Sequence, residues 1–443
     1  MTVQTKKAQR IRSRWWTALA LTAALGLAGC DALTGVRPAG TESGASEASG
    51  GTGAGKAGGA AGQPGQTAQP GQTAQSGQTA EPGKPPQSGD APSAELPYTR
   101  EVLAEGLNVP WDIAFAPDGR IFVTERPGAL RLIEQGKLAA EPVFRFDDGL
   151  YAESEAGLLG MALDPDFENN HYIYVYHSYS DGGTPYNRVV RLKEGGGRAE
   201  LDKVILDKLP ASRIHDGGRI RFGPDGMLYV TNGDASAPSI AQDVRQLGGK
   251  IMRVRPDGSI PPDNPFPGSP VYSLGHRNPQ GLAWHPESKR LFSSEHGQTA
   301  HDELNLIESG ANYGWPLVQG DETEPTPEDK GKLGPGPLKA PILHSGNETW
   351  APSGIAFVTR GPWKNNLLIA NLRGEQLLRV VLTEDGTSVH SAGSLFKNEY
   401  GRLRTVVEGP DGSIYVLTNN RDGRGRPQKG DDKIIRLKPA FAQ

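Results

Sequence analysis

A short pattern of hydrophobic and polar positions recurs along the chain: a Pro-Asp-Gly turn followed by a run of β-branched and aromatic residues. The clearest copies are APDGRIFVTE from Ala116, GPDGMLYVTNGD from Gly223 and GPDGSIYVLTNN from Gly409. Proline presets the first turn position, aspartate can cap the turn through its side chain, and glycine allows a positive φ. The run after each turn is typical of a packed strand. Each copy therefore predicts a β-hairpin.

Weaker copies of the same pattern begin at Asp164, His285 and Gly361, so that six turns are visible in all. Successive turns lie roughly fifty to seventy-five residues apart, which is the length of a four-stranded blade with variable loops. We therefore expect an all-β fold, a six-bladed β-propeller over residues 96–443. A long parallel β-helix is the structural alternative, but its repeats would be shorter. Helices are expected to be short, with residues 302–309 forming one or two helical turns at most.

Residues 1–29 have the order of a secretory signal peptide. A basic stretch around Lys6 and Arg14 is followed by an apolar run over residues 15–27, which is too short to span a bilayer comfortably. The run ends in Leu-Ala-Gly before Cys30, which resembles a bacterial lipobox and predicts lipidation of that thiol. Cys30 is also the single cysteine of the chain, so no internal disulfide competes for it. The alternative is a chance cysteine at the end of an ordinary signal.

Residues 30–95 are rich in Gly, Ala, Ser, Pro, Gln and Thr and contain the degenerate repeat GQTAQPGQTAQSGQTAEPG. Such a composition cannot bury enough apolar surface to order the chain, so we expect a disordered linker. The net charge of −4 gives no basic signature for nucleic acid. The chain is therefore expected to be exported and lipid-anchored to the extracytoplasmic face of a bacterial cell membrane, with the propeller held away from the bilayer.

Polar residues that flank the predicted blade strands are the candidates for chemistry, because propellers carry functional groups on loops at one end of the channel. His215, in RIHDGGR, carries an imidazole, the side chain most often used as a general base. Arg277 and Asn278, in GHRNPQG, offer donors for an anion or a developing alkoxide. The alternatives are a surface-loop histidine and a capped turn with an Arg–carboxylate pair.

Oxygen donors are dense between residues 295 and 316, where Glu295, Asp302 and Glu303 accompany a glycine-rich backbone. This chemistry favours a hard cation such as Ca²⁺. His296 and His301 leave zinc as an alternative, although no cysteine accompanies them, and an acidic solvated loop is the third interpretation.

Three arginines near the end of the chain are candidates for holding an anion. Arg402 and Arg404 alternate just before the last turn, so both side chains should point to one face of a strand, and Arg373 precedes them in the fifth blade. The alternative is a solvated edge. Trp350 and Trp315 can stack on a planar ligand near the mouth, although such aromatics more often pack in a core.

Several of these motifs, taken in order, resemble the soluble quinoprotein glucose and aldose sugar dehydrogenases. They are GLLGMALDPDF, HDGGRIRFGPDG, GHRNPQGLAW, DELNLI with NYGWP, and RLRTVVEGPDG. The resemblance covers about residues 109–438, and the combination of GHRNPQG with DELNLI and NYGWP is its most specific part. It implies oxidation of aldose sugars at C1 to lactones, with PQQ as cofactor together with Ca²⁺, and electron transfer to an unidentified acceptor.

The resemblance also implies roles for individual residues. His215 would be the base that takes the proton from the anomeric hydroxyl while hydride passes to PQQ. Arg277 would stabilise the oxygen of the reacting quinone carbonyl. The cofactor would further be bound by Glu155, Asn278, Arg373, Arg402, Arg404 and Trp350.

Two cation sites follow from the same resemblance. The backbone carbonyls of Gly297 and Gln298 would help to hold the Ca²⁺ that also binds PQQ. Glu303 and the carbonyl of Tyr313 would belong to a second, structural calcium site.

Some positions depart from the family pattern. Glu155 stands where these enzymes often have glutamine, and its carboxylate would repel an anionic cofactor unless it is paired or protonated. Ile214 replaces the aspartate that precedes the base in the glucose enzymes, which puts the orientation of His215 in question. Gln298 replaces a frequent proline, and the stretch around Trp350 matches only loosely. Shortened loops imply an open pocket, broad aldose specificity and a monomer or weak dimer.

Two other functions remain open at this point. One is a Ca²⁺-dependent lactonase-type hydrolase, which would need several side-chain oxygens converging on one axial metal. The other is a sugar- or ligand-binding propeller without catalysis, and the departures at Glu155 and Ile214 favour it.

Overall fold

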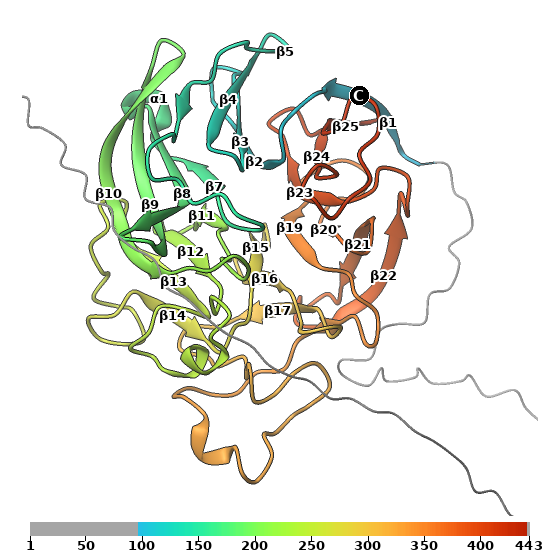
Figure 1. The fold of residues 1–443 in the computed structure, drawn as a ribbon. Helices are drawn as coiled ribbons and strands as arrows, with labels where there is room; N and C mark the ends of the chain where they lie inside the picture. Colours follow the sequence, from blue (N-terminus) through green and yellow to red (C-terminus); the bar gives the residue numbers. More distant parts are fainter. Residues whose placement is uncertain (1–95, 441–443) are drawn as a thin grey trace, which may run out of the picture. The chain divides into compact units, whose positions relative to one another are not determined.

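The computed structural model describes residues 96–440. Within this range the strands form six antiparallel sheets arranged around a centre, which confirms the six-bladed propeller (Figure 1). The predicted signal peptide over residues 1–29, the linker over residues 30–95 and Cys30 lie outside the described residues, and they stay predictions. No helix of the described part is long and apolar enough to cross a membrane.

The first three blades follow one another along the chain, and each begins with the strand nearest the centre. Their strands are β2 (Pro110–Phe115), β3 (Ile121–Glu125), β4 (Ala129–Glu134), β5 (Lys137–Leu138) and β6 (Phe144–Arg145); β7 (Leu158–Leu163), β8 (Tyr172–Asp181), β9 (Thr184–Gly195) and β10 (Arg198–Pro210); and β11 (Ile220–Phe222), β12 (Leu228–Asn232), β13 (Lys250–Val254) and β14 (Val271–Leu274).

The remaining three blades repeat this arrangement, and the last one is completed by the first strand of the domain. Their strands are β15 (Pro279–Trp284), β16 (Leu291–Glu295), β17 (Glu303–Ile307) and β18 (Leu343–His344); β19 (Pro352–Phe357), β20 (Leu367–Asn371), β21 (Gln376–Leu382) and β22 (Val389–Leu395); and β23 (Leu403–Glu408), β24 (Ile414–Thr418), β25 (Ile434–Pro439) and β1 (Tyr98–Ala104). The antiparallel pairing of β1 with β25 closes the ring.

The first strand of every blade lies at the centre of the molecule, because β2, β7, β11, β15, β19 and β23 contact one another in a closed ring. Apolar side chains fill the space between neighbouring blades. Tyr174 and Tyr176 of β8, for example, pack with Ile220, Leu228 and Met252 of the third blade.

Each predicted Pro-Asp-Gly turn, or its weaker copy, lies between the first and second strands of a blade. In an antiparallel meander, the loop before the first strand and the loop after the second strand then lie at the opposite end. His215, Arg277 and Arg402 precede first strands, so the chain order alone brings them to one end of the channel.

Helical structure in the described part is limited to α1 (Phe167–Asn170) and the short 3₁₀ helices η1 (Pro238–Gln242) and η2 (Lys330–Lys332). The expectation of one or two helical turns over residues 302–309 is wrong, because Glu303–Ile307 is strand β17. It pairs with β16 on one side and with β18 on the other, and these ladders outweigh a weak local preference.

Candidate functional site

A cavity of about 280 Å³ lies at the end of the channel where the polar loops converge. Its wall contains one carboxylate, Glu155, and four arginines contributed by the last two blades. The lining side chains are Glu155, Gln280, His296, Ala351, Leu372, Arg373, Arg402, Arg404 and Arg424. The excess of guanidinium groups favours an anionic ligand with several oxygens.

Arg402 and Arg404 both reach this cavity from the start of β23, as their alternation predicted. Both are nearly fully buried, so the interpretation as a solvated edge is wrong. Arg402 is paired with Asp422, whose Oδ2 accepts from Nε at 2.9 Å. The side-chain hydrogen bonds of Arg404 go instead to neutral groups, Gln280 Oε1 at 2.8 Å and Asn419 Oδ1 at 3.0 Å. Burial together with nearby arginines lowers the pKa of Arg404 to about 9, although the charge of Asp422 opposes this effect.

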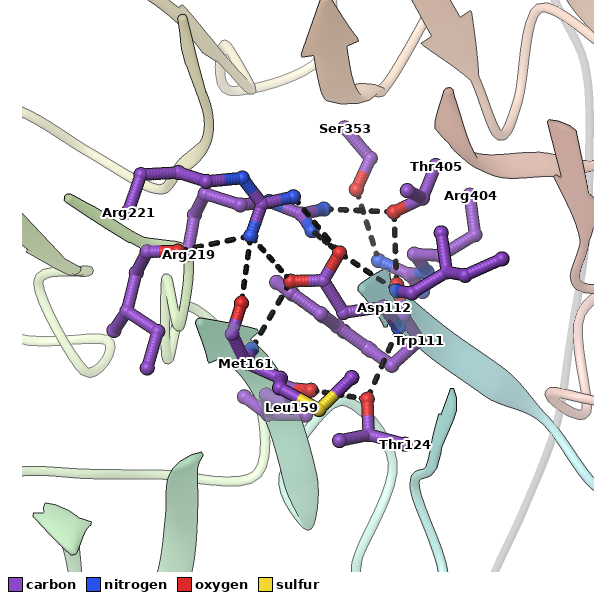
Figure 2. Close-up of polar contacts among 12 residues, drawn as sticks. Trp111, Asp112, Thr124, Leu159, Met161, Arg219, Arg221, Ser353, Arg404 and Thr405 are labelled. Atoms are coloured by element: carbon purple, nitrogen blue, oxygen red, sulfur yellow. Dashed lines mark hydrogen bonds and ion pairs between the residues drawn. The ribbon is translucent and has the colours of Figure 1, made fainter. Parts of the chain in front are cut away.

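A buried polar network connects the central strands of several blades (Figure 2). Asp112 of β2 accepts from Arg221 Nη1 at 2.7 Å and Nη2 at 2.8 Å and is paired with Arg219 at 2.8 Å. Arg219 also donates to Thr405 Oγ1 at 2.9 Å and to the carbonyl of Gln280 at 2.8 Å. Because Gln280 in turn holds Arg404, this network fixes one wall of the cavity from inside the channel.

His215 is oriented by Asp234, which the sequence analysis did not identify. Its Nδ1 lies 2.7 Å from Asp234 Oδ1, and the other carboxylate oxygen accepts from Trp315 Nε1 at 2.8 Å. A buried carboxylate at Nδ1 fixes the tautomer and leaves Nε2 as the basic nitrogen. Ile214 therefore does not leave the imidazole without an orienting partner.

Glu155 is paired rather than exposed to the cavity as a lone charge. Its Oε1 accepts from Arg424 Nη1 at 2.6 Å, and Oε2 accepts from the His215 N–H at 3.0 Å. Burial alone would raise the pKa of this carboxyl, but the charges of His296 and Arg424 and the His215 N–H lower it to about 2. Of these charges only Arg424 persists at neutral pH, because burial lowers the pKa of His296 itself to about 3.

Arg277 and Asn278 precede β15 and contact the loops of the third blade, outside the wall of this cavity. The Asn278 amide oxygen accepts from the Gly217 N–H at 3.0 Å, which ties the third blade to the fourth. Arg277 lies over the Trp315 ring at 5.3 Å and donates from Nη1 to the carbonyl of His296 at 3.3 Å. Its Nε is buried without a hydrogen-bond partner in the described part, and so is Nε2 of His296. Both atoms are available to a bound group.

The backbone of Arg277 is held by a chain of buried polar groups. Its N–H donates to Glu295 Oε1 at 3.2 Å, and Glu295 Oε2 lies 2.8 Å from His276 Nδ1. His276 Nε2 lies 2.8 Å from Ser273 Oγ. The three side chains are buried, so this Ser–His–Glu chain supports the site and offers no accessible nucleophile.

A second, smaller cavity of about 10 Å³ adjoins the first through His296. Gly297, Glu303 and Tyr313 line it, as does Glu295. Burial and the charge of Glu295 raise the pKa of the Glu303 carboxyl to about 8. Two facing carboxylates in a buried space repel each other, and a cation between them would remove that repulsion. The cavity also brings together three of the four residues that were predicted to bind a cation.

Gln298 is the fourth, and its side chain is in the wall of neither cavity. Asp302 is used structurally, because it accepts from the N–H groups of Gly297, Trp350 and Ala351. No three His, Cys, Asp or Glu side chains of the described residues converge on one metal position. A cation here would thus depend on backbone carbonyls as well, and the zinc interpretation gains no support.

Trp350 packs in the core with Phe292, Ile355 and Phe357 and is absent from the wall of either cavity. Arg373, in contrast, lines the larger cavity as predicted.

Asp234 and Arg424 are not among the residues predicted from the sequence, and His296 is predicted there only as a zinc ligand in the alternative interpretation. All three follow the second strand of a blade, in TNGD, TNNRDGR and SSEHG. This recurring position is the signal that identifies them, since these loops share one end with those that precede first strands.

The comparisons with known proteins point to one family. Residues 107–435 match the family model for glucose/sorbosone dehydrogenase. Aldose sugar dehydrogenase YliI of Escherichia coli is 33% identical over 342 residues, which cover 73% of this chain and 90% of that protein.

Two solved structures are similar over most of the domain. The first, an oxidoreductase (glucose dehydrogenase) from Thermus thermophilus, is 45% identical with a TM-score of 0.69, covering 77% of this chain and 99% of that one. The second, the PQQ-bound form of aldose sugar dehydrogenase from Streptomyces coelicolor, is 38% identical with a TM-score of 0.67, covering 77% and 98%. The chain therefore belongs to the glucose/sorbosone dehydrogenase family.

Proposed function

We propose that the chain catalyses PQQ-dependent oxidation of aldose sugars at C1 to the corresponding lactones. The observation that carries the proposal is the arginine-lined cavity beside an oriented His215–Asp234 pair, at one end of the channel. The similar aldose sugar dehydrogenase from Streptomyces coelicolor, whose structure is PQQ-bound, supports the choice of cofactor.

The residues present fit a flat tricarboxylate. Arg373, Arg402 and Arg404 line the cavity, and Arg404 has no carboxylate among its side-chain hydrogen-bond partners. The buried, unpartnered Nε of Arg277 and Nε2 of His296 are further groups for a bound oxygen or nitrogen. PQQ, when bound, supplies the acceptor for the two electrons of the sugar. Asn278 would contact it from the fourth blade, and Glu155 would lie in the wall as a neutralised carboxylate.

His215 is the proposed general base. With Nδ1 held by Asp234, Nε2 faces no hydrogen-bond partner among the described residues and can accept the proton of the C1 hydroxyl. The Asp234 carboxylate then stabilises the imidazolium that forms. Since Trp315 Nε1 fixes the other oxygen of Asp234, the pair is rigid before substrate arrives.

Arg277 is the proposed electrophilic group. Its guanidinium is held between the Trp315 ring and the carbonyl of His296, which leaves Nε to donate to an oxygen on which negative charge grows. Burial lowers the pKa of Arg277, yet nearby carboxylates oppose this effect, so it remains a cation.

Two cations are proposed in and beside the smaller cavity. The carbonyls of Gly297 and Gln298 would hold the Ca²⁺ that polarises the cofactor, and Glu303 with the Tyr313 carbonyl would hold a second ion. The facing carboxylates of Glu295 and Glu303 support this choice of a hard cation.

The localisation, oligomeric state, substrate range and electron acceptor are also proposals. The signal sequence and Cys30 support an exported protein with a lipid anchor at the membrane, and the shortened loops support a monomer or weak dimer with broad aldose specificity. The electron acceptor is a separate partner.

Reconstitution with PQQ and Ca²⁺, followed by dye reduction with glucose and other aldoses, tests the function. We expect turnover that His215→Ala lowers by about 10²–10⁴ in kcat without loss of cofactor binding. Lactone hydrolysis in the absence of PQQ, with no sugar oxidation in its presence, would select the hydrolase instead.

A further inference from the structure

Glu155 joins three parts of the site that are far apart in the sequence. It precedes β7, and its Oε2 accepts from the N–H of His215 at 3.0 Å and from Asn278 Nδ2 at 3.4 Å. Its Oε1 accepts from Arg424 Nη1 at 2.6 Å. One carboxylate therefore contacts the loop of the general base, the fourth blade and the last blade.

Arg424 reaches Glu155 from the loop after β24. Its Nη2 also donates to Ser154 Oγ at 3.1 Å, so the guanidinium bridges the last blade and the second blade. The loop that carries it is fixed, because the Arg424 N–H donates to Asp422 Oδ1 at 2.8 Å and Asp422 is paired with Arg402. The side chain of Arg424 is 49% exposed and that of Glu155 is 13% exposed, which places the pair at the mouth of the cavity.

The charge of Glu155 is a problem for the proposed ligand. Its carboxylate is in the wall of a cavity that the arginines adapt to an anion, and a nearby like charge in a partly buried site opposes binding strongly. An uncharged glutamine would avoid the repulsion. However, one end of its amide carries two N–H groups, which would face either the donor of Arg424 or the donor of His215. A carboxylate accepts on both sides, so Glu155 and Arg424 are chemically matched.

We propose that Arg424 is the counter-ion that allows Glu155, a positioning residue for His215 and Asn278, to remain ionised in the wall of an anion-binding cavity. The inference rests on the proposed function, since it takes the anion to be PQQ. In this arrangement the carboxylate of Glu155 holds the loop of His215. The guanidinium of Arg424 offsets the repulsion between that carboxylate and the anionic cofactor.

A charge-compensation cycle on the full chain tests the inference, with PQQ in the presence of Ca²⁺ as the probe and quenching of tryptophan fluorescence as the readout. Arg424→Met leaves Glu155 uncompensated and should weaken PQQ binding by about tenfold or more. Glu155→Gln should bind within about threefold of the wild type or more tightly. The double variant Glu155→Gln/Arg424→Met should return to within about threefold of the wild type, because neither charge remains.

Arg100→Met is the matched control. Arg100 forms an ion pair with Glu399, and both side chains are 44% exposed, so this variant removes the same charge from a surface pair outside the cavity. We expect its PQQ affinity to equal that of the wild type. Thermal unfolding of every variant separates a binding effect from loss of fold.

The positioning role has a separate readout in kcat. In the Arg424→Met background, Glu155→Gln keeps an acceptor for the His215 N–H, whereas Glu155→Ala removes it. We expect the alanine variant to lose at least about tenfold in kcat relative to the glutamine variant, while the two bind PQQ equally.

Two results would overturn the inference. The first is a double variant as weak as Arg424→Met, which would mean that Arg424 contacts the anion itself. The second is unchanged affinity in Arg424→Met. Failure of the wild type to bind PQQ is a different outcome, because it removes the proposed function together with everything that rests on it.

Discussion

At the scale of single residues, the proposed role of His215 as general base depends on how its imidazole is oriented. The imidazole contacts Asp234 through Nδ1, and Asp234 is itself held by Trp315 Nε1 and by the N–H of Ser236 at 2.8 Å. A neutral amide in place of this carboxylate can present a donor to Nδ1 and so favour the wrong tautomer.

Asp234→Asn should therefore lower kcat for glucose by about 10²–10⁴ while PQQ affinity stays within about threefold of the wild type. Steady-state kinetics with reconstituted enzyme measures the first quantity, and fluorescence titration measures the second. Ser236→Ala is the control, because Ser236 contacts Asp234 through its backbone. An Asp234→Asn variant with full activity would show that His215 does not need Asp234 to orient it.

Asp216, the next residue after His215, should make stability depend on pH. It is fully buried, and burial raises the pKa of its carboxyl to about 7, even though the Ser212 N–H and Asn187 Nδ2 donate to Oδ1 at 3.1 Å. The unfolded chain ionises this group near its ordinary value, whereas the folded chain keeps the proton until about pH 7. The unfolded state thus binds fewer protons over this interval, so the contribution of Asp216 to stability falls as pH rises from about 4 to about 7.

Asp216→Asn removes this dependence. We expect the free energy of unfolding to be similar for variant and wild type near pH 4, and larger for the variant by on the order of 4 kcal/mol near pH 8. Urea unfolding at the two pH values gives the comparison. A difference that does not change with pH would show that Asp216 titrates at the same pH in the folded and unfolded chains.

At the scale of elements, the buried network of Figure 2 connects the first strands of several blades, among them β2, β7, β11 and β23. Asp112 is the carboxylate that forms ion pairs with Arg219 and Arg221. Because Asp112 and Arg219 are buried, water cannot solvate either charge if its partner is lost. Asp112→Asn should lower the free energy of unfolding by about 3–5 kcal/mol, because it leaves buried guanidinium charge without its counter-ion.

Chemical denaturation measures this effect, and Asp118→Asn is the control. Asp118 pairs with Arg120 but is 50% exposed, so its loss should cost less than about 1 kcal/mol. Equal effects of the two substitutions would contradict a special role for the buried network.

The elements were predictable from the sequence where a local signal repeats. The Pro-Asp-Gly turn or its weaker copy occupies the same hairpin in each blade, so its recurrence gave the number of blades. Residues 302–309 show the limit, since DELNLI became a strand only through pairing with β16 and β18.

The site was predictable in part for the same reason. His215, Arg277, Arg402 and Arg404 stand in motifs at first strands. The position of Asp234 and Arg424 after second strands shows which end of the channel they reach, but not that they contact His215 and Glu155. Arg424 meets Glu155 across 269 positions of the sequence. The core position of Trp350 likewise depends on packing between blades four and five.

At the scale of the whole molecule, the ring is closed by its own two ends, because β1 pairs with β25 in the last blade. The predicted anchor at Cys30 lies outside the described residues and precedes β1 in the sequence. Cys30→Ser should move the protein from the detergent-rich phase to the aqueous phase in Triton X-114 partitioning, with sugar oxidation by the reconstituted enzyme unchanged. Retention of the variant in the detergent phase would mean that another feature binds the membrane.

The most direct test of the account is a titration of PQQ into metal-free protein, with and without Ca²⁺, followed by cofactor absorbance. The arginine-lined cavity and the adjoining carboxylates predict saturation at one PQQ per propeller when Ca²⁺ is present, and binding weaker by at least about tenfold when it is absent. Absence of binding under both conditions, or equal PQQ affinity with and without Ca²⁺, would contradict the interpretation of the site as a cofactor and cation pocket.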